Sequence, residues 1–507
     1  MNELGSPLTE ARRAHAAQEW PTAAAHFGMV AAEQFTTDDL HAYFEAVWWL
    51  GRPEDTGRLG AAAFDALRAD SRPADAAKVA YWLALFHMSR GDEPQAFGWA
   101  GRAGRVLEGI PQNPGHGYLL YLTEVQVNLH TGDPSAAVEA AHQVHGLGRE
   151  FNDPDLLAAG LYGQGHALIK LGQVTDGLAL LDEAMVGVLD GQVASPVAGA
   201  LYCNTIAACH EVFDLRRMAR WTELTERWLA LQSAALGYAG ICRTHRAQLQ
   251  LLRGDWEDAE RGAQRVAAEF DGYLTLYAGK AWYVVGEVRR LRGDPTAAQA
   301  YHQAQARGHD PQPGRALLIL QQGDPAGAAT SVQSALAAAG SDPLRRAPIC
   351  AAAVEIGLAA ERLDFATEAE SELAGTATTY ATSGLEAMAA TARGAMLLAE
   401  GSAKEALAVL RDAYRRWVEL GAEHDAAGTC RWLAKAYRAL GDETSAAAEG
   451  ARAEETYSDS AGHSPNRRRP MGSPDASARC WRWWPEDIRT ARSARSFTSA
   501  SAPSPAT

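Results

Sequence analysis

Hydrophobic residues recur at helical spacing along the first 457 residues, and short polar turns interrupt them about every forty residues. One turn pattern returns seven times: a glycine, in most instances followed by aspartate, and an alanine five residues after the glycine. The glycines are Gly91, Gly132, Gly254, Gly293, Gly323, Gly401 and Gly441, and the alanines are Ala96, Ala137, Ala259, Ala298, Ala328, Ala406 and Ala446. Self-similarity at a nearly fixed period predicts a repeat architecture.

Each of these turns contains the residues that end one helix and begin another. Glycine adopts the left-handed conformation after a helix, and aspartate caps the free N–H groups of the next helix. Proline directly after the aspartate suits the first helical turn. The alanine one turn further on is small enough for two antiparallel helices to cross closely. The pattern therefore predicts helical hairpins, each with one of these turns as its elbow.

Weaker elbows fill the gaps between the seven strong ones. They lie at Gly172, near Asp214 and near Asp364. The elbows are then about 38 to 42 residues apart, except for the short step from Gly293 to Gly323. This pattern resembles the tetratricopeptide repeat, although ~40 residues in place of the usual 34 implies longer helices. We expect an all-α, tetratricopeptide-like α-solenoid of about ten helical hairpins over residues 1–457.

The composition agrees with helices that pack closely, because alanine is abundant and only 8% of the residues are aromatic. The formal charge of −15 makes the chain a poor binder of polyanions. This charge is unevenly placed. Residues 458–507 hold eight arginines and four acidic residues, about +4, which leaves about −19 for residues 1–457.

The chain has no stretch of ~20 apolar residues and no apolar segment near its start. Its six cysteines form no C-x-x-C pair and fit no secreted disulfide framework. We therefore expect a cytoplasmic protein with reduced thiols and no membrane association.

Residues 181–230, LDEAMVGVLDGQVASPVAGALYCNTIAACHEVFDLRRMARWTELTERWLA, resemble the helical-repeat region of LuxR-type transcriptional regulators. The resemblance extends over roughly residues 10–455. It implies an array that senses a protein or peptide partner, or a small-molecule effector, and that controls a C-terminal helix-turn-helix domain. A free-standing tetratricopeptide-type scaffold that recruits proteins remains the alternative.

Helical periodicity stops before residues 458–507, which are rich in Ser, Arg and Pro and predict a disordered basic tail. If reading begins at the third base of each codon, residues 480–485 are compatible with VLALVA. The same offset over residues 457–507 permits LTRREREVLALVAGG, NREIGAELHIS and ERTVARH, which resemble a LuxR-type helix-turn-helix. We hypothesise that the tail is an out-of-frame remnant of that domain. Specific DNA binding is then expected of the intact family but not of this chain, which lacks the recognition helix.

Two patterns were considered as nucleotide or metal sites. The phosphate-binding pattern G-x-x-x-x-G-K-[ST] is absent, and the nearest string, Gly279-Lys280-Ala281, favours a buried helical segment. The zinc candidates are Cys203, Cys209, His210, Cys242 and His245. Their spacings are not those of a zinc module, so buried thiols are the expected outcome. We expect no metal and no cofactor.

Aromatic residues are dense toward the N-terminal end of the array. Their helical spacing predicts that most of them belong to the core, but a solenoid presents one helix of each pair on its concave face. The candidates for lining a groove are Tyr43, Trp48, Trp82, Tyr118 and Tyr121. No nucleophile with a nearby base and no isolated pair of carboxylates is recognisable, so we expect a binding protein and not an enzyme.

Overall fold

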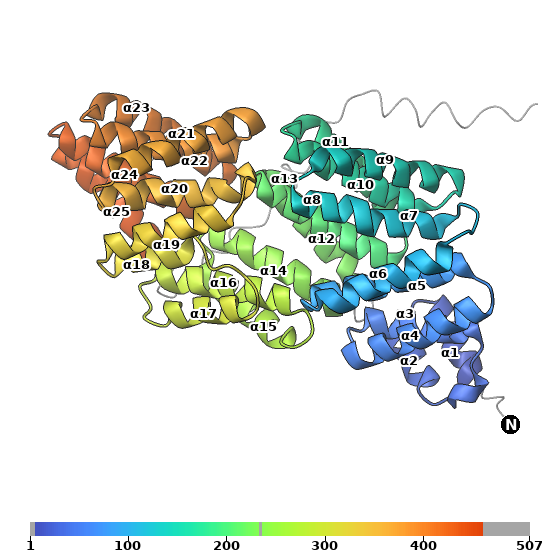
Figure 1. The fold of residues 1–507 in the computed structure, drawn as a ribbon. Coiled ribbons are helices and arrows are strands. Elements are labelled where there is room, and N and C mark those ends of the chain that lie inside the picture. Colours follow the sequence, from blue (N-terminus) through green and yellow to red (C-terminus); the bar gives the residue numbers. More distant parts are fainter. Residues whose placement is uncertain (1–5, 233–235, 460–507) are drawn as a thin grey trace, which may run out of the picture. The chain divides into compact units, whose positions relative to one another are not determined.

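The computed structural model describes residues 6–232 and 236–459, and these residues form helices and connecting turns without a β-strand (Figure 1). The described residues belong to one compact unit. The last helix ends at Asp459, two residues beyond the predicted boundary. The predicted disordered tail and the helix-turn-helix in its shifted frame therefore lie, from residue 460 onward, outside the described residues.

The helices pair into twelve antiparallel hairpins, which confirms the tetratricopeptide-like α-solenoid. The first helices of the hairpins are α1 (Pro7–Ala16), α3 (Thr37–Trp49), α5 (Pro73–Ser89), α7 (Pro114–Leu120), α10 (Pro154–Lys170), α12 (Ser195–Glu211), α14 (Leu236–Leu252), α16 (Thr275–Leu291), α18 (Gly314–Gln321), α20 (Pro343–Ala359), α22 (Ser383–Ala399) and α24 (Glu423–Ala439). A π-helical stretch (Tyr121–Gln126) joins α7 to α8 (Val127–Thr131), so these three segments act as one helix.

The second helices return antiparallel to the first. They are α2 (Trp20–Phe27), α4 (Pro53–Ala69), α6 (Glu93–Leu107), α9 (Pro134–Glu150), α11 (Val174–Leu189), α13 (Leu215–Ala230), α15 (Trp256–Glu269), α17 (Ala297–Ala306), α19 (Pro325–Ala338), α21 (Leu363–Tyr380), α23 (Ala403–Leu420) and α25 (Glu443–Asp459). The short step from Gly293 to Gly323 is explained by α17 and α18, which have only 10 and 8 residues. Across residues 6–232 and 236–459, no helix combines the length and the apolar character that crossing a bilayer demands.

The elbows have the predicted chemistry. All seven glycines of the strong pattern have positive φ, between 68° and 87°, where a side chain would be strained. The side chains that accept a hydrogen bond from a backbone N–H in the first turn of the following helix are Asp92, Asp133, Asp324 and Asp442. Asp255 makes no such bond, so capping is not uniform along the array.

Six of the seven pattern alanines are at most 1% exposed, as expected where the two helices of a hairpin cross. Ala298 is the exception, because it is exposed and Ala297 is fully buried in its place. The shift has a local cause. The Asp294 side chain accepts hydrogen bonds from the backbone N–H and the hydroxyl of Thr296, and this extra turn delays the start of α17.

The array is longer at its N-terminal end than the ten elbows indicate. The first elbow has Gln18, at φ 56°, in the left-handed conformation, and the second has Gly51 at φ 64°. Neither is followed by aspartate, so neither matches the sequence pattern. The crossing positions are nevertheless buried: Ala23 is fully buried and Thr56 is 1% exposed. Thr56 satisfies its hydroxyl by donating to the Arg52 carbonyl at 2.7 Å.

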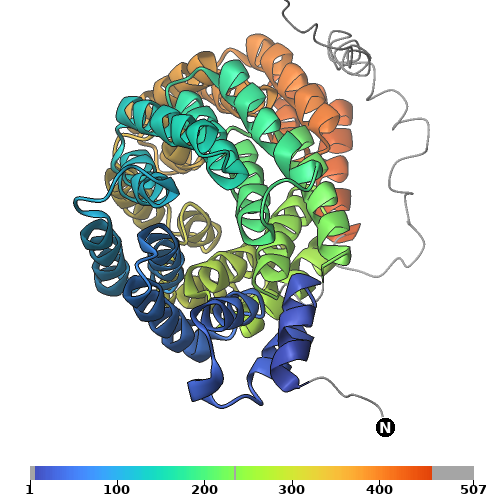
Figure 2. The ribbon, with the colours of Figure 1, turned by 90° about the vertical axis from the view of Figure 1, so that its right-hand side faces the viewer.

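The hairpins curve so that hairpins five apart in sequence contact each other (Figure 2). At the end of α10, the Lys170 ammonium donates to an Asp342 carboxylate oxygen at 2.8 Å, just before α20. The Thr382 hydroxyl, before α22, donates to the Val212 carbonyl, after α12, at 2.6 Å. These contacts close one turn of a superhelix, whose inner face is formed by the first helices of the hairpins.

Candidate functional site

The five aromatic residues predicted to line a groove lie mostly in the core. Tyr43, Trp82, Tyr118 and Tyr121 are each at most 9% exposed, and Trp48 is partly buried. The structure brings Trp48 and Trp82 together, with ring centroids 5.1 Å apart, while Tyr43 stacks on Phe27. Ligand contact by these residues stays a prediction, because none of them lines a described cavity.

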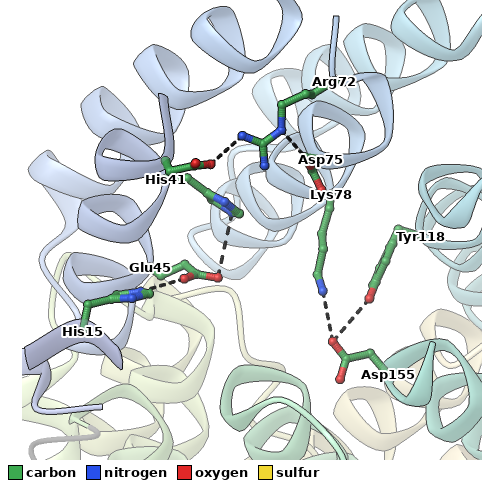
Figure 3. A network of polar contacts seen from close by, with 9 residues as sticks. His15, His41, Glu45, Arg72, Asp75, Lys78, Tyr118 and Asp155 are labelled. Carbon is green, nitrogen blue, oxygen red and sulfur yellow. Dashed lines mark hydrogen bonds and ion pairs between the residues drawn. The ribbon is translucent and has the colours of Figure 1, made fainter. Parts of the chain in front are cut away.

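Tyr118 has a structural partner that the sequence did not reveal (Figure 3). Its hydroxyl donates to the buried Asp155 carboxylate at 3.3 Å, and Lys78 donates to the same oxygen at 3.1 Å. The other Asp155 oxygen accepts from the backbone N–H of Ala194 at 2.8 Å. Asp155 thus ties α5, α7 and α10 to the start of α12, and every partner in this network is satisfied within the protein.

The zinc candidates lie on two neighbouring helices, α12 and α14, as buried or partly buried side chains. In the part of the chain that the structure describes, no group of three or more His, Cys, Asp or Glu residues is arranged to hold a metal ion. Burial raises the pKa of Cys242 to about 12, so this thiol is inert. Lys280 lies inside α16 and not in a phosphate-binding loop, as the sequence indicated.

The main concave feature is a cavity of about 1470 Å³ on the inner face of the superhelix. The first helices of successive hairpins, from α10 to α24, supply most of its wall. Aromatic rings of Tyr283, Trp417 and Trp432 line it beside titratable side chains. A concave site with apolar walls and a few directed polar groups is the usual form of a ligand pocket.

Lys280 is a cation in the wall of this cavity without a counter-ion among the described residues. It is partly buried, and its ammonium lies 5.2 Å from the centroid of the Tyr277 ring. Among residues 6–232 and 236–459, it has no hydrogen bond and no ion pair. Burial lowers the pKa of Lys280, and Glu211 only partly opposes this effect. An ammonium in this environment lowers the stability of the fold unless a bound group supplies the missing negative charge.

Three histidines from different elements face this lysine. Burial, followed by the charge of Lys280, lowers the pKa of His210 to about 4 and that of His309 to about 4. The same two causes, in the same order, lower the pKa of His245 to about 3. The imidazoles are therefore neutral at pH 7, so each has one N–H donor. His245 donates its N–H from Nδ1 to the Gln248 side-chain oxygen at 3.2 Å, which leaves the N–H groups of His210 and His309 for a ligand.

The carboxylates on this side of the cavity are already engaged. Glu211 accepts hydrogen bonds from His166 at 2.9 Å and from Lys170 at 2.5 Å. Burial opposes the ionisation of Glu211, but these partners outweigh it and lower its pKa to about 2. Glu287 is likewise paired, with Arg290 at 2.7 Å. Neither carboxylate neutralises Lys280.

A second unsatisfied group lies at another part of the wall. The buried Oδ2 atom of Asp425, in the first turn of α24, has no hydrogen-bond partner among the described residues. Burial raises the pKa of Asp425, and the neighbouring His424 only partly offsets this. An unpaired buried acceptor that costs stability is typical of a functional position.

Replacing Asp425 by asparagine is expected to raise the free energy of unfolding by about 1 kcal/mol at pH 7, because the neutral amide removes a buried, unpaired charge. The folded-state pKa lies above the unfolded value of ~3.9, so ionisation costs stability as pH rises through that interval. The gain should vanish near pH ~3. Urea denaturation at both pH values measures it, with the exposed Asp190→Asn as control. A loss of stability at pH 7 would contradict this assignment.

Sequence reasoning did not find this site, although it named some of its residues for other reasons. Lys280 was weighed only as a phosphate-loop lysine, and His210 and His245 only as metal ligands. His309 and Asp425 carry no motif. A usable signal for Lys280, His210, His245 and Asp425 is their position on the first helix of a hairpin, because these helices form the inner face and the elbow pattern identifies them. His309 lies in the connection between α17 and α18 and carries no such signal.

No family model and no curated protein matches this chain. Solved structures that are similar include a chain of the APC/C hetero-tetramer Cut9–Hcn1, with 13% identity, 90% of this chain and 98% of that chain covered, and a TM-score of 0.38. Rap protein in complex with the Competence and Sporulation Factor has 11% identity, with 76% and 99% covered and a TM-score of 0.40. The quorum sensor NprR from B. thuringiensis, in its apo form, has 13% identity, with 76% and 98% covered and a TM-score of 0.34. At these identities the likeness concerns the helical-repeat fold alone.

Proposed function

We propose that this array is the ligand-sensing region of a LuxR-type transcriptional regulator and that it binds its effector in the concave cavity. The observation that carries the proposal is the cavity of about 1470 Å³, whose wall includes two charged groups without protein partners, Lys280 and Asp425. The resemblance of residues 181–230 to the repeat region of these regulators supplies the regulatory context. The volume suits a short peptide or a small molecule.

Filling the cavity should abolish ligand retention without unfolding the protein. Gly428 lies in α24 on the cavity wall, and a side chain added there would meet no atom within 4 Å. Gly428→Trp is therefore expected to occupy the cavity while it also removes a helical glycine, which favours the helix. The full chain is purified from its own cells and denatured, and mass spectrometry quantifies the molecules that are released.

The matched control is Gly375→Trp, at an exposed helical glycine in α21 that also has open space around it. The wild type and Gly375→Trp should release the same compound in similar amounts, and Gly428→Trp should release about tenfold less or none. Equal release from Gly428→Trp, or no bound compound in the wild type, would refute cavity binding.

We also propose that the output domain is the helix-turn-helix encoded in the shifted frame after about Tyr457. The support is that the shifted frame, with suitable synonymous codons, permits strings that resemble the family's helix-turn-helix over residues 457–507. Resequencing the locus tests it directly. A shifted frame that encodes no helix-turn-helix would overturn this part of the proposal and would leave a free-standing binding array.

A further inference from the structure

Lys280 is a charged side chain without a counter-ion among the described residues. Its side chain extends from α16 into the cavity wall, where the Tyr277 ring lies beside it at 5.2 Å and no carboxylate within the described ranges is close enough to pair with it. Lys280 is partly buried in this wall, where a counter-ion would offset the cost of removing its charge from water.

The groups that face Lys280 from every packed element are donors, or acids that are already engaged. They are Glu211, His210 and Cys203 from α12, His245 from α14, His309 from the connection between α17 and α18, and Tyr277 from α16 itself. Glu211 is held by His166 and Lys170. The Lys280 ammonium and these three imidazoles line one cavity. Its wall also holds the engaged carboxylate of Glu211 and, beside His309, the exposed carboxylate of Asp310.

We propose that Lys280, with His210 and His309, forms an anion-binding subsite that takes a carboxylate or phosphate group of the ligand. The ammonium supplies the charge, and the neutral imidazoles of His210 and His309 supply N–H donors. Charge-assisted hydrogen bonds of this kind are about twice as strong as neutral ones and fix the orientation of the bound group. This inference rests on the proposed function, because it assigns the chemistry of the ligand that the cavity receives.

Binding should be coupled to proton uptake. Burial lowers the pKa of Lys280, and burial followed by the charge of Lys280 lowers the pKa of each of the three histidines. A bound anion reverses both effects and raises these pKa values, so the occupied site holds more protons than the empty one. Affinity for the anion should therefore increase as the pH falls.

Isothermal titration calorimetry of the full chain tests the subsite with three probes. These are inorganic phosphate, acetyl-pentaalanine with a free C-terminal carboxylate, and the same peptide with a C-terminal amide. We expect phosphate or the free-acid peptide to bind more tightly than the amide, and Lys280→Met to weaken that binding about tenfold or more. Lys280→Arg keeps the charge and should retain most of the affinity.

The control for net charge is Lys404→Met, at an exposed lysine of α23 outside the cavity, which should bind like the wild type. Preference for the free-acid peptide would identify a carboxylate as the ligand group, and preference for phosphate would identify a phosphate. Lys280→Met removes an unpaired charge, so it should melt no lower than the wild type, which separates lost binding from lost folding.

The subsite is refuted if no anionic probe binds the wild type, or if Lys280→Met binds every probe as tightly. Its failure is distinguishable from failure of the proposed function. If Gly428→Trp releases no compound but Lys280→Met releases as much as the wild type, the cavity binds a ligand without this anion contact. If Gly428→Trp also retains the compound, cavity binding itself is wrong.

Discussion

Replacing Glu287 by alanine is expected to lower the free energy of unfolding by about 3–5 kcal/mol, because it leaves a buried arginine without its counter-ion. Glu287 and Arg290 are 8% and 6% exposed, and an Arg290 Nη2 donates to the carboxylate at 2.7 Å. The Tyr301 hydroxyl donates to the other carboxylate oxygen at 2.5 Å. Chemical denaturation of the purified variant measures the loss.

The double variant Glu287→Met, Arg290→Met should recover most of this stability, because it removes both charges and fills similar volume. The control is Glu257→Ala, which breaks an exposed pair with Arg261 on α15 and should cost at most about 1 kcal/mol. Burial opposes ionisation of Glu287, but Arg290 outweighs it and lowers the pKa of this carboxyl. The stabilisation should therefore be lost as pH falls below ~4.5. A single variant no less stable than Glu257→Ala would contradict this account of the buried pair.

If the frameshift proposal is right, restoring the shifted frame after about Tyr457 creates specific DNA binding, which we do not expect of the chain as written. The restored chain selects DNA from a random pool, and fluorescence anisotropy then compares selected with random DNA. We expect the restored chain to prefer selected DNA by ~10³-fold or more, as specific regulators do. The present chain, which carries about −19 on residues 1–457, should show no preference.

The matched control is the restored chain truncated after Tyr457, which keeps the array and lacks the helix-turn-helix. It should also show no preference for selected DNA. Failure of the restored chain to enrich any sequence would contradict the frameshift hypothesis, as would equal preference by the truncated control.

The elbows were predictable because they are local chemistry. The glycine in a left-handed conformation and the alanine at a helix crossing are needed by the hairpin itself, so they recur in the sequence wherever they are used. The elbows at Gln18 and Gly51 were not predicted, because residues other than a Gly-Asp pair can also form the left-handed turn between two helices. The prediction for Ala298 was wrong because the side-chain turn at Asp294 delays the start of α17 by two residues relative to the other elbows.

The site was much less predictable, because it depends on how distant hairpins are brought together. Lys280 and His245 are 35 positions apart, and nothing in either helix alone indicates that they share a wall of one cavity. The aromatic residues near the N-terminal end gave a stronger signal but pack mainly into the core. A high density of aromatic residues in the sequence indicates packing in the core. The charges of Lys280 and Asp425 that lack a protein partner can be recognised only in the folded superhelix.

The central claim is that the inner face of this superhelix receives a ligand. The most direct test is an experimental structure of the full chain purified with the compound that it retains from its cells. We predict that the compound lies in the cavity between α16 and α24, with an acidic group within hydrogen-bond distance of the Lys280 Nζ. A compound bound on the outer face, against the second helices of the hairpins, would contradict the claim.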